Sequence, residues 1–307
     1  MISKNDKGTN QRMSRAVAFA VKGKHIMLTA TAINSLIQHY HSQTPLKMVV
    51  QSESIYQADI DFIRTLPALN HQPNISVEFW KPPYDFMKRV SENFSTGTQL
   101  PKMVLWRLFL PYYFSTYDQI VYLDNDVLVT TDINELFDQL TEDDVIGGVL
   151  DYSNAIYHTP EQVKRFFLPN LSQYINGGVL VMNTKAYRDF VSADRMIAQI
   201  NKRNYPLGDQ SILNITFFNH IHVLPWRFNR QFDRRGLKEY EPLNPSRVHE
   251  IESQLDQPGI IHFIHNNHFW SPWEKFSPST PWEQLWWETF ADVMHKRVTS
   301  SAEQLKQ

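Results

Sequence analysis

The chain has 307 residues, 42% of them hydrophobic and 13% aromatic, which is enough for the core of one large domain or of a domain with an appendage. Its formal net charge of −2 gives no general attraction to nucleic acid, and the absence of cysteine excludes disulfides, thiolate chemistry and cysteine-ligated metals. No apolar run approaches the roughly 20 residues that span a bilayer, and residues 1–13 lack the apolar core of a signal peptide. We therefore expect a flexible tail at 1–13 and a soluble, cytoplasmic protein that binds no nucleic acid.

Short apolar runs alternate with amphipathic segments in the first third of the chain. Strands are predicted at 16–21, 46–50 and 75–79, and helices at 25–39 and 55–66. This strand–helix–strand rhythm indicates right-handed, parallel α/β units. A nucleotide bound by such a fold lies near the first strand-to-helix loop, which here begins at Val21, continues through Lys22, Gly23 and Lys24, and ends at His25.

The segment 100–114 is predicted to be a helix rich in large apolar residues. Its one charge after Lys102 is Arg107, next to Trp106. A guanidinium among such residues must reach solvent along its own stem or find a partner. It can bind either phosphate oxygens or a carboxylate through two hydrogen bonds, so both a ligand phosphate and a core acid are open as its partner.

The stretch 120–129 is an apolar run interrupted by two carboxylates, Asp124 and Asp126. Such a run indicates a strand buried on both faces of a parallel sheet, and ligands of such sheets lie at the carboxyl ends of strands. Two carboxylates about 4 Å apart repel by roughly 4 kcal/mol at an effective dielectric near 20, a cost that a bound divalent cation removes. The alternative is a simple strand-to-turn link, with Asp132 and Glu135 as a capping box of the next helix.

Three later segments also end or begin at polar residues beside apolar strands. A strand at 145–151 ends in Asp151, and a strand at 176–183 begins with Asn176 and two glycines. Glycine lets the backbone approach a ligand closely, and an asparagine amide can both donate to and accept from ligand hydroxyls; a tight turn into a core strand is the alternative. The segment 207–213 opens a helix for which Asp209 is a candidate N-cap.

The C-terminal part is rich in tryptophan, and 282–290 is predicted to be an amphipathic helix. Such a helix either packs on the main domain or docks on a membrane surface. Its flanks carry few basic residues, so we favour packing on the main domain and keep peripheral membrane contact as the alternative. We expect residues 14–275 to form the main domain, residues 276–307 to form a helical extension, and the chain to be disordered after Val298.

The sequence YLDNDVLV, residues 122–129, resembles the metal-binding signature of the GT-A glycosyltransferases, specifically of the retaining enzymes of family eight. Four further segments follow the order of that family: LPKMVLWRLFLPYYF before the acids, and NGGVLVMN, GDQSILN and IIHFIHNNHFWSPW after them. The resemblance runs from about Ala16 to about Trp287. It implies a GT-A fold, in which a Rossmann-like, mixed but mainly parallel central sheet is flanked by helices.

The resemblance also implies an activity: transfer of a hexose, glucose or galactose, from a UDP-sugar to a hydroxyl of a glycan or of a lipid-linked or protein-linked sugar, with the anomeric configuration retained. The implied cofactor is Mn²⁺, with Mg²⁺ as the weaker candidate. Family residues with catalytic roles match Asp151, Asp209 and Gln210. Donor-binding positions match Ala20, Val21, His25, Arg107, Asp124, Asn125, Asp126, Asn176, Gly177 and His268.

The family mechanism leaves two routes open for Gln210. Either its carbonyl oxygen attacks the anomeric carbon from the face opposite UDP, or the leaving phosphate assists an acceptor that enters on the same face. The metal ligands implied are Asp124, Asp126 and a histidine. Counting from the strand IIHF selects His262, whereas counting back from Pro272-Trp273 selects His265. We favour His262, because the strand entry fixes where the backbone arrives.

Two departures from the family pattern concern donor binding. Lys22, Gly23 and Lys24 replace acidic and Asn residues that usually contact the uracil, and the family's phosphate-binding Lys is missing near His268. Two other functions stay open. A metal-dependent nucleotidyltransferase also needs paired acids and a nucleotide-binding α/β sheet, and the altered first loop suggests a degenerate, non-catalytic protein that binds sugar nucleotides.

Overall fold

The computed structural model describes residues 13–81, 83, 85–91, 102–264, 271–275 and 277–304. Seven strands form the central sheet in the order β3-β2-β1-β4-β7-β6-β8, and two short strands, β5 and β9, form a second sheet. The strands are β1 (Arg15–Lys22), β2 (Leu46–Glu53), β3 (Ile75–Trp80), β4 (Gln119–Leu123), β5 (Val127–Val129), β6 (Ile146–Leu150), β7 (Ile175–Asn183), β8 (Ile221–Val223) and β9 (Ile260–His262).

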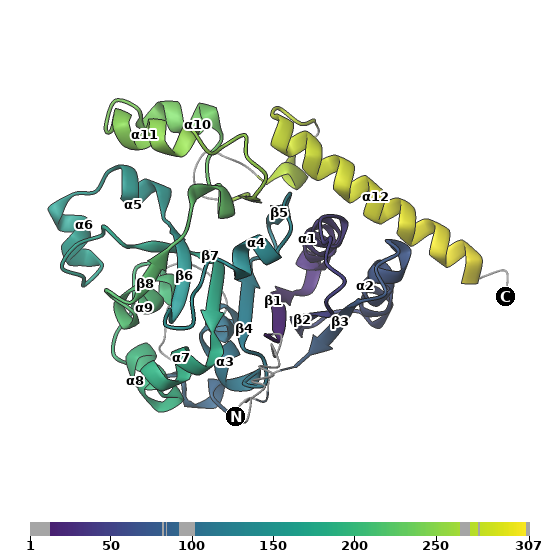
Figure 1. The fold of residues 1–307 in the computed structure, drawn as a ribbon, viewed down its shortest axis with the longest axis horizontal. Coiled ribbons are helices and arrows are strands. Elements are labelled where there is room, and N and C mark those ends of the chain that lie inside the picture. Colours follow the sequence, from purple (N-terminus) through teal and green to yellow (C-terminus); the bar gives the residue numbers. More distant parts are fainter. Residues whose placement is uncertain are drawn as a thin grey trace, which may run out of the picture.

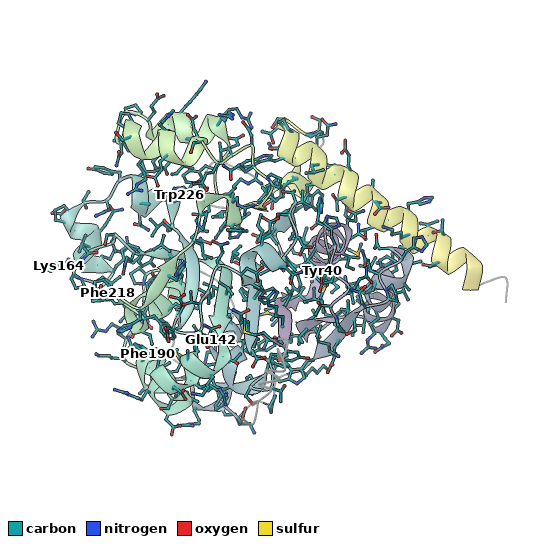
Figure 2. All side chains as sticks on the ribbon, viewed as in Figure 1. Tyr40, Glu142, Lys164, Phe190, Phe218 and Trp226 are labelled. Atoms are coloured by element: carbon teal, nitrogen blue, oxygen red, sulfur yellow. The ribbon has the colours of Figure 1, made fainter. Side chains whose placement is uncertain are left out.

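Helices cover the central sheet (Figure 1). The α-helices are α1 (Ile26–Gln38), α2 (Gln57–Leu69), α3 (Leu110–Tyr113), α4 (Asn134–Phe137), α5 (Tyr152–Ile156), α6 (Pro160–Arg165), α7 (Thr184–Phe190), α8 (Ala193–Asn201), α9 (Gly208–Thr216), α10 (Arg234–Tyr240), α11 (Pro245–Glu252) and α12 (Pro281–Gln304). Short 3₁₀ helices span Gly23–His25, Met87–Arg89, Lys102–Phe109, Trp226–Phe228 and Pro272–Glu274. Tyr40 and Trp226 lie inside this packing and Lys164 lies at its edge (Figure 2).

The central sheet is mixed, as predicted. β1 pairs in parallel with β2 and β4, β2 with β3, and β6 with β8, whereas β7 runs antiparallel to both β4 and β6. The reversal of β7 matters for function, because it brings the start of β7 beside the end of β4. Leu123 is in register with Val179, and the backbone N–H of Asp124 donates to the carbonyl of Gly178 at 2.8 Å.

The small sheet adds a third segment to the same place. β5 and β9 are antiparallel, and Val127 is in register with His262. The N–H of Phe263 donates to the carbonyl of Asp126 at 2.9 Å, which fixes the two chain segments against each other. The end of β4, the start of β7 and the end of β9 therefore converge, although they are far apart in sequence.

The C-terminal helix packs on the rest of the fold, as predicted. α12, in yellow in Figure 1, lies against α1. Trp286 is buried and stacks on Phe290 with ring centroids 5.2 Å apart. Trp286 also shares an apolar cluster with Leu28, Leu128, Ile261 and Phe263, so α12 supports the small sheet. Among the helices within the described ranges, none is both long and apolar enough to cross a bilayer.

Two predicted elements are wrong in kind or extent. Within the helix predicted at 100–114, Lys102–Phe109 form a 3₁₀ helix, which is followed by the single turn α3. Pro111 has no N–H to donate to the carbonyl of Arg107, so an α-helix could not pass through it without losing a bond. The chain is also helical beyond Val298, because α12 continues to Gln304, and the hydroxyls of Ser300 and Ser301 donate to the carbonyl of Arg297.

The predicted capping box after the acids does not form. Asp132 accepts a hydrogen bond from the N–H of Asn134 at 2.8 Å, but Glu135 bonds instead to the hydroxyl of Thr131 and to Arg227. Glu135 therefore links α4 to the 3₁₀ helix Trp226–Phe228 through Arg227.

Candidate metal and donor site

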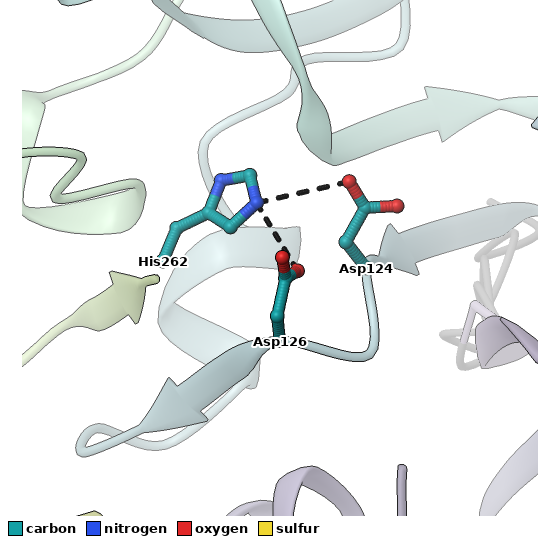
Figure 3. A group of neighbouring side chains, drawn as sticks. All are labelled: Asp124, Asp126 and His262. Atoms are coloured by element: carbon teal, nitrogen blue, oxygen red, sulfur yellow. Dashed lines mark ion pairs between the residues drawn. The ribbon is translucent and has the colours of Figure 1, made fainter. Parts of the chain in front are cut away.

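The apolar run that carries the two acids is divided between two sheets. β4 ends at Leu123, the chain turns through Asp124-Asn125-Asp126, and β5 begins at Val127. This turn directs both carboxylates toward His262, whose Nε2 lies 3.3 Å from Oδ1 of Asp126 and 3.7 Å from Oδ2 of Asp124 (Figure 3). One ligand atom from each residue lies within 4.8 Å of the others. Two carboxylates and one imidazole could therefore hold a single cation.

The donor set fits a hard or borderline divalent ion such as Mn²⁺. Nδ1 of His262 bonds to Oδ1 of the buried Asn229 at 3.0 Å, which leaves Nε2 to face the acids. An imidazole fixed in this way by a partner on its other nitrogen is typical of metal-ligating histidines. Burial lowers the pKa of His262, but Asp126 and then Asp124 outweigh burial, so this pKa lies above its ordinary value.

Arg107 is buried and links two acids. Its Nη2 lies 2.9 Å from Asp124 and its Nε lies 2.9 Å from Asp209, while its Nη1 donates to the carbonyl of Gly177. Tyr122 lies under the guanidinium at 4.3 Å and donates its hydroxyl to Asp124 at 2.7 Å. Burial opposes the charge of Arg107, but the two acids outweigh it and raise its pKa. Of the two partners that the sequence left open, the core acids are the ones present here.

Asp209 is not the N-cap that the sequence predicted. α9 begins at Gly208 after Leu207, which caps it with no side-chain hydrogen bond, and Gly208 has a positive φ of 52° that glycine adopts without strain. Asp209 lies one residue inside the helix and bonds to Arg107 instead. Burial raises its pKa to about 6 even though Arg107 opposes this shift, and the nearby Asp124 adds to it.

Gln210 connects the start of β7 to the end of β6. Its Oε1 accepts from the N–H of Gly177 at 3.0 Å and from Nδ2 of Asn176 at 3.2 Å. Its Nε2 donates to Oδ2 of Asp151 at 3.3 Å. Asp151 also caps α5 by accepting from the N–H of Asn154, and burial raises its pKa. Residues that the sequence predicted for the site therefore form one hydrogen-bonded cluster with Arg107: Asp151, Asn176, Gly177 and Gln210.

The first loop follows β1, which is parallel to β4, and Phe19 is in register with Leu123, the residue before Asp124. Ala20 and Val21 are at the end of β1, Lys22 pairs with Glu53 at 3.3 Å, and His25 is exposed at the start of α1. Lys22 therefore already has a carboxylate partner. His265 and His268 lie outside the described residues, so His262 is the candidate ligand that the structure places beside the acids.

Two residues of the site escaped the sequence analysis. The sequence indicates Tyr122 only as part of the buried run, although its hydroxyl bonds to Asp124. Asn229, which bonds to His262, follows a short 3₁₀ helix and belongs to no motif or periodic pattern. A tyrosine two residues before paired acids has its side chain on their side of the strand, which could have identified Tyr122; no comparable signal existed for Asn229.

The mixed sheet with paired acids at its central strand end is the architecture of GT-A glycosyltransferases. Galactosyltransferase LgtC, solved with donor and acceptor sugar analogs, superposes with a TM-score of 0.69 at 20% identity over 90% of this chain and 95% of that one. The bifunctional glycosyltransferase WbbM superposes with a TM-score of 0.72 at 20% identity, over 90% of this chain and 52% of that one. At such identities, the likeness shows the fold alone.

The family follows from the sequence profile of "Glycosyl transferase family 8", which matches residues 16–274; the chain belongs to this family. The predicted resemblance to family eight is therefore confirmed. Glycosyltransferase GlyE of Streptococcus pneumoniae is 26% identical over 282 residues, 89% of this chain and 60% of that protein. Lipopolysaccharide 1,2-glucosyltransferase of Escherichia coli is 24% identical over 204 residues, 60% of this chain and 57% of that protein.

The curated relatives are longer than the matched region. Glycosyltransferase GlyA of S. pneumoniae, 23% identical over 189 residues, is matched over only 24% of its length. The chain thus spans between about a quarter and three fifths of these three proteins.

Proposed function

We propose that this protein is a retaining glycosyltransferase that moves a hexose from a UDP-sugar to a hydroxyl of a glycan, with a divalent metal, Mn²⁺ in preference to Mg²⁺. The observation that carries the proposal is the convergence of Asp124, Asp126 and Nε2 of His262 at one point. The names of two similar proteins, a lipopolysaccharide 1,2-glucosyltransferase and a galactosyltransferase, support glucose or galactose as the sugar and a lipid-linked or other glycan as the acceptor.

The metal would be held by Asp124, Asp126 and His262, and when bound it would stabilise the charge that develops on the leaving diphosphate. Arg107 holds Asp124 from the side opposite His262 and keeps Asp209 close. Because Arg107 is buried and charged, it would also supply a fixed positive charge near a bound donor without reorganisation.

Gln210 and its neighbours would face the transferred sugar. Asn176 and Gln210 present amide groups that can donate to and accept from sugar hydroxyls. Oε1 of Gln210 already accepts two hydrogen bonds, from Gly177 and Asn176. Attack by this oxygen would require it to give up at least part of that bonding, which supports the same-face route, in which the leaving phosphate assists the acceptor hydroxyl.

Two parts of the proposal concern regions beyond this cluster. His25 would stack on the uracil base, and Ala20 and Val21 would line the nucleotide, as the family pattern implies for the end of β1. A cytoplasmic location, with peripheral membrane contact through α12, stays a prediction.

Calorimetry of UDP binding tests the metal role. We expect UDP affinity to depend on Mn²⁺, to vanish with EDTA, and to be lost in Asp124→Ala and Asp126→Ala, because either change removes one of two carboxylate ligands. The matched control is Asp138→Ala, which removes an exposed carboxylate paired with Arg15 and should leave UDP affinity unchanged. Equal UDP affinity with and without EDTA would contradict the proposal.

A screen of nucleotide sugars for Mn²⁺-dependent hydrolysis would identify the donor. With that donor, Gln210→Ala is expected to fold normally and bind UDP as the unaltered protein does, but to lose transfer rate. If the variant only melts at a lower temperature and transfers sugar at the normal rate, Gln210 has a structural role alone.

A further inference from the structure

Asn229 joins the candidate metal ligand to the residues around Gln210. Its side chain is fully buried and bonds in two directions: Oδ1 to Nδ1 of His262 at 3.0 Å, and Nδ2 to Oδ1 of Asn176 at 2.9 Å. Asn176 in turn donates from Nδ2 to Gln210. A continuous line of hydrogen bonds therefore runs from His262 through Asn229 and Asn176 to Gln210 and on to Asp151.

The direction of these bonds follows from one backbone donor. The N–H of Gly178 points at the side chain of Asn176 at 2.9 Å, and a backbone N–H can only donate. The atom of Asn176 that it meets must be the oxygen, so the atom of Asn229 that meets the same oxygen must be the NH₂ group. The oxygen of Asn229 then faces His262, and Nδ1 of His262 must carry the hydrogen.

A second backbone donor fixes the other end independently. The N–H of Gly177 points at Gln210 at 3.0 Å, so that atom of Gln210 is the oxygen, and the NH₂ group of Asn176 faces it correctly. The NH₂ group of Gln210 is then left for the carboxylate of Asp151. Both glycine N–H groups thus impose the same polarity, and no amide in the line has to be reversed.

We propose that Asn229 is a positioning residue that orients the residues at both ends of this line of hydrogen bonds, His262 and Gln210. By accepting from Nδ1–H it holds Nε2 of His262 toward Asp124 and Asp126, and by donating to Asn176 it keeps the amide of Gln210 in place. This inference rests on the proposed function, because it assigns to Asn229 the orientation of a ligand in the proposed metal site. If Asn229 had a purely structural role, replacing it would lower stability without changing Mn²⁺ affinity or kcat separately.

The two ends can be tested separately with Asn229→Ala and Asn229→Asp. Alanine removes both bonds, so Mn²⁺ affinity, measured from the electron paramagnetic resonance signal of free Mn²⁺, should fall about tenfold or more. Aspartate still accepts from Nδ1–H but cannot donate to Asn176, so Mn²⁺ affinity should return to within about threefold of the unaltered protein. The kcat of donor hydrolysis should be lower in both variants than in the unaltered protein, because neither side chain can donate to Asn176.

Asn183→Ala is the matched control. Asn183 lies at the other end of β7, is buried like Asn176, and donates to the backbone carbonyls of Thr141 and Asp144, far along the strand from His262. It should lower the melting temperature without changing Mn²⁺ affinity.

Each outcome decides the proposal. If the unaltered protein binds no Mn²⁺, the proposed function and this inference both fail. If it binds Mn²⁺, and Asn229→Ala binds it equally while losing stability like Asn183→Ala, the inference fails alone. Recovery of both affinity and kcat by Asn229→Asp would also overturn it, because the bond to Asn176 would then have no role.

Discussion

Gly178 of β7 lies directly against His262 and Asp124, and replacing it with alanine should separate them. A Cβ on Gly178 would lie 2.1 Å from Cε1 of His262 and 2.9 Å from Oδ2 of Asp124. Non-bonded carbon atoms need about 3.5 Å, so the imidazole would have to move by roughly 1.4 Å. Metal–ligand distances tolerate only about 0.2 Å, and His262 should therefore cease to be a ligand.

The adjacent glycine provides the control. A Cβ on Gly177 would lie 3.4 Å from both Arg107 and Gln210, which is ordinary contact. We expect Gly178→Ala to weaken Mn²⁺ binding about tenfold or more and to cost about 1–3 kcal/mol of stability through overpacking, whereas Gly177→Ala should change both little.

Isothermal calorimetry with Mn²⁺ and urea unfolding of the two variants would measure these effects. A Gly178→Ala variant that binds Mn²⁺ as tightly as Gly177→Ala would refute the reasoning. It would mean either that His262 is not a ligand or that the backbone of β7 yields before the imidazole does.

Three further predictions follow from burial and charge. Arg107→Ala should cost about 3–5 kcal/mol in urea unfolding, because Asp124 and Asp209 would lose the buried cation that they share, and Asp209 would then have to stay ionised without it or take up a proton; a loss below about 1 kcal/mol would contradict this. Mn²⁺ affinity should fall by up to about tenfold per pH unit as pH drops below the raised pKa of His262, because a proton on Nε2 then occupies the ligand atom. Calorimetry at several pH values should show this dependence in the unaltered protein and not in His262→Ala. Trp286→Ala should lower the unfolding free energy by about 3–5 kcal/mol, since the indole is only 2% exposed; denaturant unfolding that matches the unaltered protein would show that α12 is not held by it.

Local patterns in the sequence were sufficient to predict the parallel half of the fold. Strands, helices and their order follow from hydrophobic periodicity, and the position of Asp124 and Asp126 at a strand end follows from the apolar run before them. The direction of β7 does not follow, because a buried apolar strand has the same pattern whichever way it runs in the sheet. The contact between Gly178 and Asp124 therefore needed the structure.

Side-chain partners were the harder part of the site to predict. Arg107 was expected to need a partner, but the sequence could not choose between a phosphate and the acids that bind it here. Asp209 has the sequence context of an N-cap, yet tertiary contact with Arg107 determines its role. Asn229 lies outside every motif, and only its distances to His262 and Asn176 reveal it.

The balance of charge at the site explains why a cation fits it. Among the described residues, Asp124 and Asp209 share one fixed positive charge, that of Arg107, and Asp126 lies beside His262, so the fully ionised group carries an excess of negative charge. Without a metal, protons reduce this excess: the pKa of His262 is raised by Asp126 and Asp124, and burial raises the pKa of Asp209 to about 6. A divalent ion between Asp124, Asp126 and His262 would supply the same charge without protonating a ligand. The raised pKa of His262 is therefore the response expected of a site whose acids are arranged for a cation, and it has the same cause as the proposed metal binding.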